Sequence, residues 1–319
     1  MTRRLHREHL SVTEIFGLRP FRRRFAEALM AVRGQPEIPA TRWGLSSARI
    51  LKPWISLPTW LGRTRSDRRI PIYNLFNHTQ TPAEEGWSVR VTQVRDYRGG
   101  ELTYDSHNGT DFAVPTGTKV VAPADGRVLL LPNEFNRGGL KVVLDHGHGI
   151  ATSSNHLART LVEVGQFVRR GQPIGLSGFS GLDGFLFFPW AAPHVHFNVF
   201  LDGLQVDPFA RSGEVSLWLG GEPRPAPVGE EVPYQATTWN VSALQRVVAS
   251  CRNPRVRARL EGIPGTDALA AELLYQTSYY PTRFRERPRL YASAHRRRPI
   301  LTLPFSGDDF IGIHYPDNL

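Results

Sequence analysis

Cysteine, lysine and long apolar runs are scarce in this 319-residue sequence. The one cysteine, Cys251, excludes an internal disulfide and any zinc finger built on cysteines. No apolar run approaches the roughly 18–20 residues of a membrane span, and the first residues contain no continuous apolar segment of the kind found in secretory signals. We therefore expect no transmembrane segment and, by default, a cytoplasmic location.

Basic charge is concentrated towards the start of the chain, and arginine supplies all but three of the 39 basic side chains. Residues 1–100 hold 18 basic and 8 acidic side chains, whereas residues 101–210 hold 7 and 10. Arginines on a solvated surface are the favoured interpretation of this asymmetry. Contact between the basic N-terminal region and a polyanion is the alternative.

Changes in composition divide the chain into four segments. Residues 1–87 form a basic region rich in proline and tryptophan, with a helix expected over 11–31, capped by Thr13 and interrupted by Pro20. Residues 88–212 alternate short β-rich runs with turns, which is typical of a compact all-β domain. Residues 213–239 are predicted to be a linker. Residues 240–319 are predicted to be an α+β region, with helices over 241–280 and one or two strands near the end.

The strands of the central segment are expected in six runs. These are WSVRVTQV, TDFAVP, TKVVAPADGRVLLLP, LKVVLDHGHG, GQFVRRGQPIGLSG and HVHFNVFLDG.

Histidines carry the chemical information in this segment, where two pairs have the form H-x-H. His194 and His196 lie in a strand-like run, so both side chains are expected on one face of the strand. Asn198 shares that face, and its favoured interpretation is a polar surface residue; a residue that orients His196 is the alternative. His146 and His148 lie instead among turn formers, so this pair is predicted to close a hairpin rather than to bind a metal.

A second cluster, His107-Asn-Gly-Thr-Asp111, precedes another strand-like run. Gly109 allows the chain to bend so that the imidazole and the carboxylate converge. Imidazole nitrogen and carboxylate oxygen are both favoured ligands of zinc, and two histidines with one carboxylate leave the fourth position of a catalytic site open.

Five blocks of the central segment, in this order, resemble the LytM/lysostaphin-type zinc endopeptidases. The blocks are His107–Ala113, Lys119–Gly126, Ser154–Leu157, Gly165–Gly175 and Pro193–Phe197. The resemblance covers roughly residues 88–209 and implies a duplicated-hybrid-motif fold. We thus expect a mainly β catalytic core of antiparallel sheets, with α-containing N- and C-terminal flanks.

The resemblance also assigns roles. It implies that His107, Asp111 and His196 bind one zinc ion, and that His156 and His194 are catalytic without binding the metal. The sequence has no H-E-x-x-H helix, so no glutamate is offered as general base, and a neutral histidine suits that task because its pKa lies near neutral pH. Either histidine can accept the proton while the other donates one.

Two departures from the family pattern bear on activity. Ser154 stands where the family usually has a tyrosine, whose hydroxyl is thought to assist the tetrahedral intermediate. The loop before His194 reads GFSGLDGFLFFPWAAP instead of a short run of glycine and threonine. Its apolar side chains are expected to pack against a flanking region rather than to form a wall for the substrate.

Three functions agree with these patterns. The favoured one is a zinc metalloendopeptidase that cuts peptide cross-links of peptidoglycan, reaching the wall after export or release. A non-enzymatic regulator of cell-wall hydrolases is the second, although such family members typically lack ligands that are present here. A metallopeptidase acting on another peptide or protein inside the cell is the third.

Overall fold

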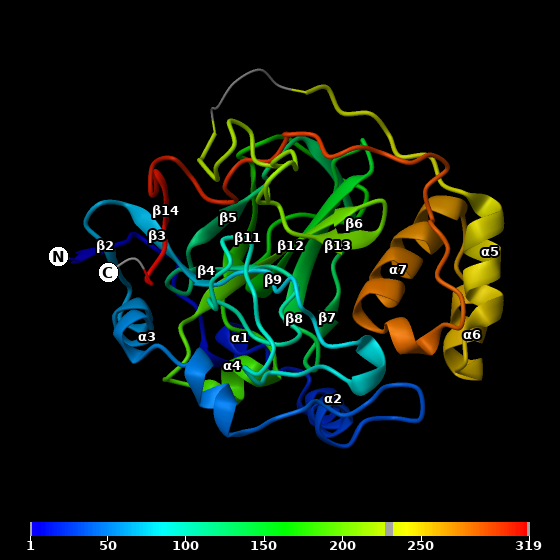
Figure 1. The fold of residues 1–319 in the computed structure, drawn as a ribbon, viewed down its shortest axis with the longest axis horizontal. Helices are drawn as coiled ribbons and strands as arrows, with labels where there is room; N and C mark the ends of the chain where they lie inside the picture. Colours follow the sequence, from blue (N-terminus) through cyan, green and yellow to red (C-terminus); the bar gives the residue numbers. More distant parts are fainter. Residues whose placement is uncertain (1, 227–231, 318–319) are drawn as a thin grey trace.

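The computed structural model describes residues 2–226 and 232–317. A large sheet forms the centre of the molecule (Figure 1). From one edge to the other its main strands are β10 (Phe167–Val168), β6 (Gly126–Leu130), β8 (Gly139–Asp145), β9 (Ile150–Thr160), β12 (His194–Leu201), β4 (Thr110–Ala113), β3 (Arg69–Asn74) and β14 (Gly312–His314).

Four short strands complete this sheet: β5 (Lys119–Val121), β7 (Asn133–Glu134), β11 (Pro173–Ser177) and β13 (Leu204–Val206). Its described pairings are antiparallel except for that of β14 with β3. A separate pair joins β1 (Thr2–Arg4) to β2 (Arg63–Arg65). The prediction of a mainly β, antiparallel core with helices in the flanks is confirmed.

The alternation of side chains along β12 separates the core from the candidate site. Val195, Phe197 and Val199 are fully buried in the main apolar cluster, where Phe197 stacks on Trp218. His194 and His196 point to the opposite face of the strand, because successive side chains of a strand alternate between its two faces. One run of sequence thus supplies both apolar packing and polar chemistry.

The described part of the N-terminal flank holds three α-helices, α1 (Val12–Ile15), α2 (Phe21–Arg33) and α3 (Pro53–Trp60). The helix expected over 11–31 is divided in two at Gly17–Pro20. Its first part is capped by Ser11, not by Thr13, because Ser11 and Glu14 bond reciprocally to each other's backbone N–H groups.

The apolar loop before His194 contains α4 (Leu182–Phe187), which packs partly against this flank. Phe188 lies edge-on to Phe16 and Trp60, and Trp60 donates to the carbonyl of Ala191. The prediction that this loop packs on a flanking region therefore holds for part of it. Four of its large side chains stay about half exposed: Phe185, Leu186, Phe188 and Trp190.

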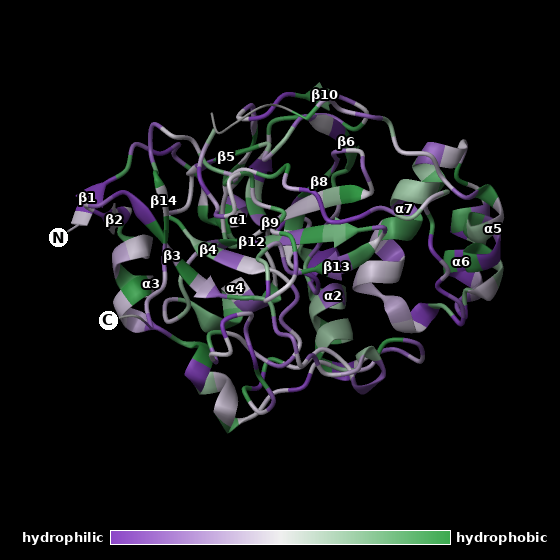
Figure 2. Cartoon of the chain, turned by 45° about the horizontal axis from the view of Figure 1, so that its top comes forward, coloured by the Kyte–Doolittle hydropathy of each residue, from purple (hydrophilic) through white to green (hydrophobic). Residues whose placement is uncertain are grey.

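Three helices of the C-terminal flank lie together at one end of the sheet (Figure 1): α5 (Val241–Ser250), α6 (Pro254–Glu261) and α7 (Thr266–Tyr279). Figure 2 shows hydrophobic residues on α5 and α7 as well as in the central strands. Leu244 and Leu274 are buried in one cluster with Ala151 and Phe200 of the sheet. This packing fixes the end of α7 beside strands that carry the candidate site.

One expectation about strands was wrong, and one strand was not foreseen. The run WSVRVTQV forms no strand, because backbone N–H groups of Thr92 and Gln93 donate to the carboxylate of Asp105 instead of to a neighbouring strand. Strand β3 lies in the proline-rich N-terminal region, where no strand was specified, and it pairs with β4 on one side and β14 on the other.

No helix within the described residues is long and apolar enough to cross a membrane.

Candidate zinc and catalytic site

Neighbouring strands bring together three of the five predicted site residues. In the antiparallel pairing of β4 with β12, Asp111 lies directly opposite His196, and His194 lies two residues along the same face. His107 lies in the loop that leads into β4. Its position is fixed because its Nδ1 donates to the backbone oxygen of Leu75 over 2.6 Å.

His107, Asp111 and His196 form a compact cluster of buried donor atoms. Asp111 Oδ1 lies 3.0 Å from His107 Nε2 and 2.7 Å from His196 Nδ1, and the two nitrogens are 3.1 Å apart. This is the one group of metal-ligand side chains found among the described residues. The three predicted zinc ligands therefore converge.

The hydrogen bonds around this cluster fit a cation. With His107 Nδ1 donating to Leu75, its Nε2 presents a lone pair to the cluster. His196 Nε2 faces the side-chain oxygen of Asn108 at 3.2 Å, which leaves Nδ1 as the inward lone pair. Two lone pairs and one carboxylate oxygen then face each other, and a shared cation relieves their repulsion. Two nitrogens and one oxygen are a donor set that zinc favours.

Asp111 is held by a partner that the sequence analysis missed. Asn74 of β3 donates from its side-chain nitrogen to Asp111 Oδ2 over 2.7 Å, so Oδ1 alone is left for the cluster. Asn74 lies 37 positions earlier in the chain. No local pattern identified it, because β3 itself was not predicted.

His156 and His194 lie side by side next to the cluster, with ring centres 4.8 Å apart. Each Nδ1 donates to a backbone oxygen, at 2.7 Å to Ser180 for His156 and 2.8 Å to Ala192 for His194. Each Nε2 consequently carries the lone pair of the neutral ring. His194 Nε2 lies 3.6 Å from Asp111 Oδ1, so both predicted catalytic histidines face the same small volume.

Burial keeps His156 uncharged near neutral pH. Loss of solvation, followed by repulsion from His194, lowers the pKa of His156 to about 3. Its backbone has a positive φ of 60°, an uncommon conformation that interrupts the regular alternation of β9. The neutral ring has a free lone pair for a proton, but it is a weaker base than the imidazole with a near-neutral pKa that the sequence led us to expect.

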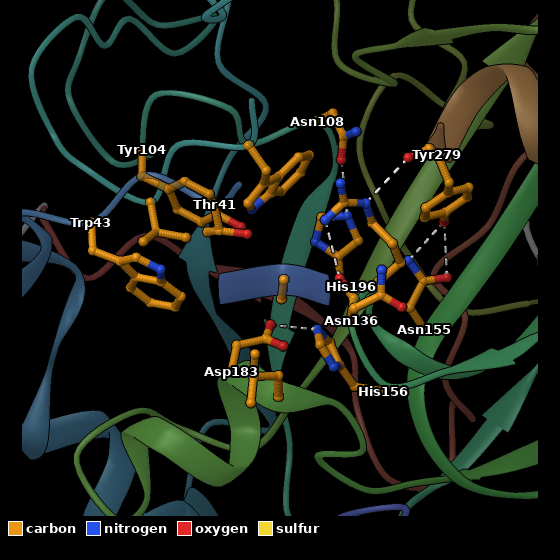
Figure 3. Close-up of a pocket in the computed structure, with 16 residues that line it drawn as sticks. Thr41, Trp43, Tyr104, Asn108, Asn136, Asn155, His156, Asp183, His196 and Tyr279 are labelled. Carbon is orange, nitrogen blue, oxygen red and sulfur yellow. Dashed lines mark hydrogen bonds and ion pairs between the residues drawn. The ribbon is translucent and has the colours of Figure 1, made fainter. Parts of the chain in front are cut away.

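Asp183 of α4 is a carboxyl group that the sequence analysis did not identify. Its Oδ2 lies 3.6 Å from His156 Nε2, as the dashed line in Figure 3 marks. Partial loss of solvation raises the pKa of this carboxyl, whose side chain is 41% exposed. Asp183 lies in the loop that departs from the family pattern, for which the sequence analysis made a prediction about the apolar side chains only. It is placed to stabilise His156 when that ring carries a second proton.

The C-terminal flank also reaches the site through Tyr279, the last residue of α7. The Tyr279 hydroxyl donates to Asn198 over 2.8 Å and accepts from the side chain of Asn155 over 3.0 Å. Asn198 donates in turn to the backbone and side-chain oxygens of Asn108, which contacts His196. The interpretation of Asn198 as a surface residue was wrong, because it is fully buried.

We expect Tyr279→Phe to reduce turnover without loss of zinc. The change leaves two buried carboxamides short of a partner, which costs about 1–3 kcal/mol of folding free energy and loosens the support of His196. Tyr275→Phe is a matched control, since Tyr275 lies in the same helix and donates to Glu134 instead. The midpoint temperature of thermal unfolding should fall in both variants, whereas kcat should fall in Tyr279→Phe alone. Equal kcat values would limit Tyr279 to a role in stability.

His156 and His196, two of the five predicted site residues, line a hollow whose walls come from the core and from both flanks (Figure 3). The N-terminal flank supplies Ala31, Thr41, Trp43 and Trp87, and the C-terminal flank supplies Tyr279. The remaining lining residues are Val89, Tyr104, Asn108, Asn136, Arg137, Gly138, Asn155, His156, Leu182, Asp183 and His196.

The other H-x-H pair has the predicted structural role. His146 and His148 lie in the turn between β8 and β9. His146 is buried, with its ring nitrogens bonded to the backbone oxygen of Asp125 and the hydroxyl of Thr152. Neither residue belongs to a metal-ligand group within the part of the chain that the structure describes.

The sequence of this region matches a known family. Residues 105–208 match the model of peptidase family M23, which confirms the predicted resemblance. Zinc is the metal that this family and the donor set both indicate.

Three relatives illustrate what this domain is similar to. An uncharacterized metalloprotease of Haemophilus influenzae is 38% identical over 102 residues, which cover 32% of this chain and 20% of that protein. The peptidoglycan DD-endopeptidase ShyA of Vibrio cholerae is 42% identical over 101 residues, covering 32% and 22%. The murein hydrolase activator EnvC of Escherichia coli is 36% identical over 138 residues, covering 42% and 28%. The similarity thus spans less than a third of each relative.

Proposed function

We propose that this chain is a zinc metalloendopeptidase that hydrolyses peptide cross-links of peptidoglycan. The observation that carries the proposal is the convergence of five side chains on one small volume: His107, Asp111, His156, His194 and His196. Three of them offer donor atoms suited to zinc, and the other two bond through Nδ1 to backbone oxygens, which leaves each Nε2 available beside those atoms. The similarity to a peptidoglycan DD-endopeptidase supports the choice of substrate.

His107, Asp111 and His196 would hold the metal. When bound there, zinc supplies a Lewis acid that polarises a carbonyl group and makes water more acidic. The outer hydrogen bonds from Asn74 and to Leu75 orient the ligands before the metal arrives, so little reorganisation is needed on binding.

His156 and His194 would move the protons of the reaction. One Nε2 accepts a proton from the attacking water, and the other ring, once protonated, gives one to the leaving amine. The carbonyls of Ser180 and Ala192 hold both rings in the required tautomer. Asp183 stabilises the doubly protonated form of His156. The sequence analysis assigned this role to no residue.

A regulator of cell-wall hydrolases is the second candidate, favoured by the similarity to a murein hydrolase activator. The two functions differ in what they require of the site. A regulator needs no intact set of ligands, whereas the set here is complete and buried. We therefore place the enzyme first.

Digestion of purified sacculi, compared with digestion of a denatured protein, tests the substrate. The zinc-loaded chain should release soluble fragments from sacculi and leave the denatured protein intact. The opposite preference would show a general peptidase. Release only in the presence of an added wall amidase would instead support the regulator.

Removal of zinc should lower thermal stability, because a metal that binds only the folded state adds its binding free energy to folding. At a free zinc concentration about 1,000 times the dissociation constant this contribution is about 4 kcal/mol. Unfolding scans with added zinc and with chelator should differ by several degrees in Tm. The His107→Ala variant should show no such difference. Coincident scans of the wild type would contradict zinc binding at this site.

A further inference from the structure

Arg137 is a cationic side chain at the site to which the proposed function assigns no role. It lies in the turn between β7 and β8, and among the described residues that line the site hollow it is the one arginine or lysine. The neighbouring Gly138 accepts a hydrogen bond from the backbone N–H of His156 over 2.9 Å. The turn that carries Arg137 is therefore bonded directly to one of the two catalytic histidines.

The guanidinium group of Arg137 is held in place by neutral groups only. Its Nε donates to the backbone oxygen of Tyr279 over 3.2 Å, and its Nη1 donates to that of Asn136 over 3.1 Å. The group also lies 5.4 Å from the ring centre of Tyr280, within the range of a cation–π contact. These contacts fix its orientation without neutralising its charge.

No acidic side chain within the described residues forms an ion pair with Arg137. Glu134, three positions earlier, instead accepts hydrogen bonds from the hydroxyls of Tyr275 and Tyr280. An arginine has five N–H donors in a planar fork. In Arg137, Nε and Nη1 each donate to a backbone oxygen, whereas Nη2 has no hydrogen-bond partner among the described residues.

A second, larger hollow meets the site hollow at this arginine. Arg137, Trp87, Asn108 and Tyr279 line both hollows. Among its described lining residues, the second hollow has polar uncharged side chains, Arg137 and Arg287, and no aspartate or glutamate. Arg287 forms an ion pair with Glu84 over 3.8 Å, so Arg137 is the cation without an acidic partner, among the described lining residues, that a substrate passes on its way from the histidines into this hollow.

We propose that Arg137 forms a subsite for a free carboxylate on the substrate residue that adjoins the cleaved amide. A carboxylate matches the planar fork of arginine in a bidentate hydrogen bond, and partial burial strengthens such a pair. The subsite rests on the proposed function for the position of the cleaved bond. It restricts the substrate to peptides with that acidic group, and it disfavours peptides in which the group is amidated.

Equilibrium binding to a non-cleaving protein tests this subsite separately from activity. The zinc-loaded His156→Ala variant is titrated with two purified cross-linked muropeptide dimers, one with the free carboxylate beside the cross-link amide and one with a carboxamide there. We expect the free acid to bind roughly ten- to a hundredfold more tightly, the ratio for one charge-assisted hydrogen bond. Arg137→Gln in the same background should bring the ratio close to one.

Two further variants complete the design. Arg137→Lys keeps the charge without the fork and should retain only part of the preference. Arg285→Gln removes an equal charge from an exposed arginine outside both hollows and should retain all of it. Zinc content and thermal unfolding check that each variant is folded. The comparison of the two dimers in the His156→Ala parent tests the subsite even if a variant at Arg137 fails to fold.

Equal affinities for the two dimers would overturn the subsite, as would loss of the preference in Arg285→Gln to the same extent as in Arg137→Gln. Preferential binding of the free acid by the His156→Ala parent, together with a zinc-loaded wild type that cuts neither dimer, would uphold the subsite and overturn the proposed hydrolysis instead. The two failures are thus distinguishable.

Discussion

His107→Ala, Asp111→Ala and His196→Ala are each expected to leave the protein without bound zinc and with hydrolysis at background level. Each substitution removes one of three donor atoms that lie within about 3 Å of one another, and two ligands from the chain hold the ion far less tightly than three. The measurements are zinc per chain by elemental analysis and release of fragments from sacculi.

A matched histidine outside the site serves as the control. His148 lies in the hairpin turn with a positive φ of 54°, a conformation that asparagine tolerates. His148→Asn should keep one zinc per chain and full activity. Full zinc occupancy in any of the three ligand variants would remove that residue from the ligand set.

His156→Ala and His194→Ala are expected to keep the zinc and to lose turnover. The three ligand side chains remain in these variants, whereas a positioned acid or base typically contributes about 10²–10⁴-fold to the rate. The fall should appear in kcat for each variant. If both rings serve one path of proton transfer, the double variant should be little slower than the slower single variant.

Two results would contradict these roles. Near-normal turnover of His156→Ala would make the Ser154–Leu157 block structural, with His194 sufficient for the chemistry. Loss of zinc from either variant would show that the histidine supports the metal rather than the protons.

The sequence predicted those parts of the site that lie on a single strand or in a short motif. Strand alternation placed His194 and His196 on one face, and the spacing of His107 and Asp111 indicated a second set of ligands on a neighbouring segment. These inferences needed only local geometry. The structure brings all four side chains together as expected, with His156 beside them.

The groups that support the site could not be predicted in this way. Asn74, Asp183 and Tyr279 reach the site from β3, from the inserted loop and from α7, and each meets a partner far away in the sequence. Arg137 contacts the backbone oxygen of Tyr279 across 142 positions. Such contacts depend on how the flanks pack on the sheet, for which the sequence offers no periodic signal.

Muropeptide analysis of sacculi, after incubation with the wild type and with His156→Ala at one zinc per chain, tests the central claim most directly. We predict that the wild type converts cross-linked dimers to monomers with a new amine and a new carboxylate at the cut peptide bond, and that His156→Ala leaves the dimers nearly intact. A wild-type chain that holds one zinc and leaves every cross-link intact would contradict the account.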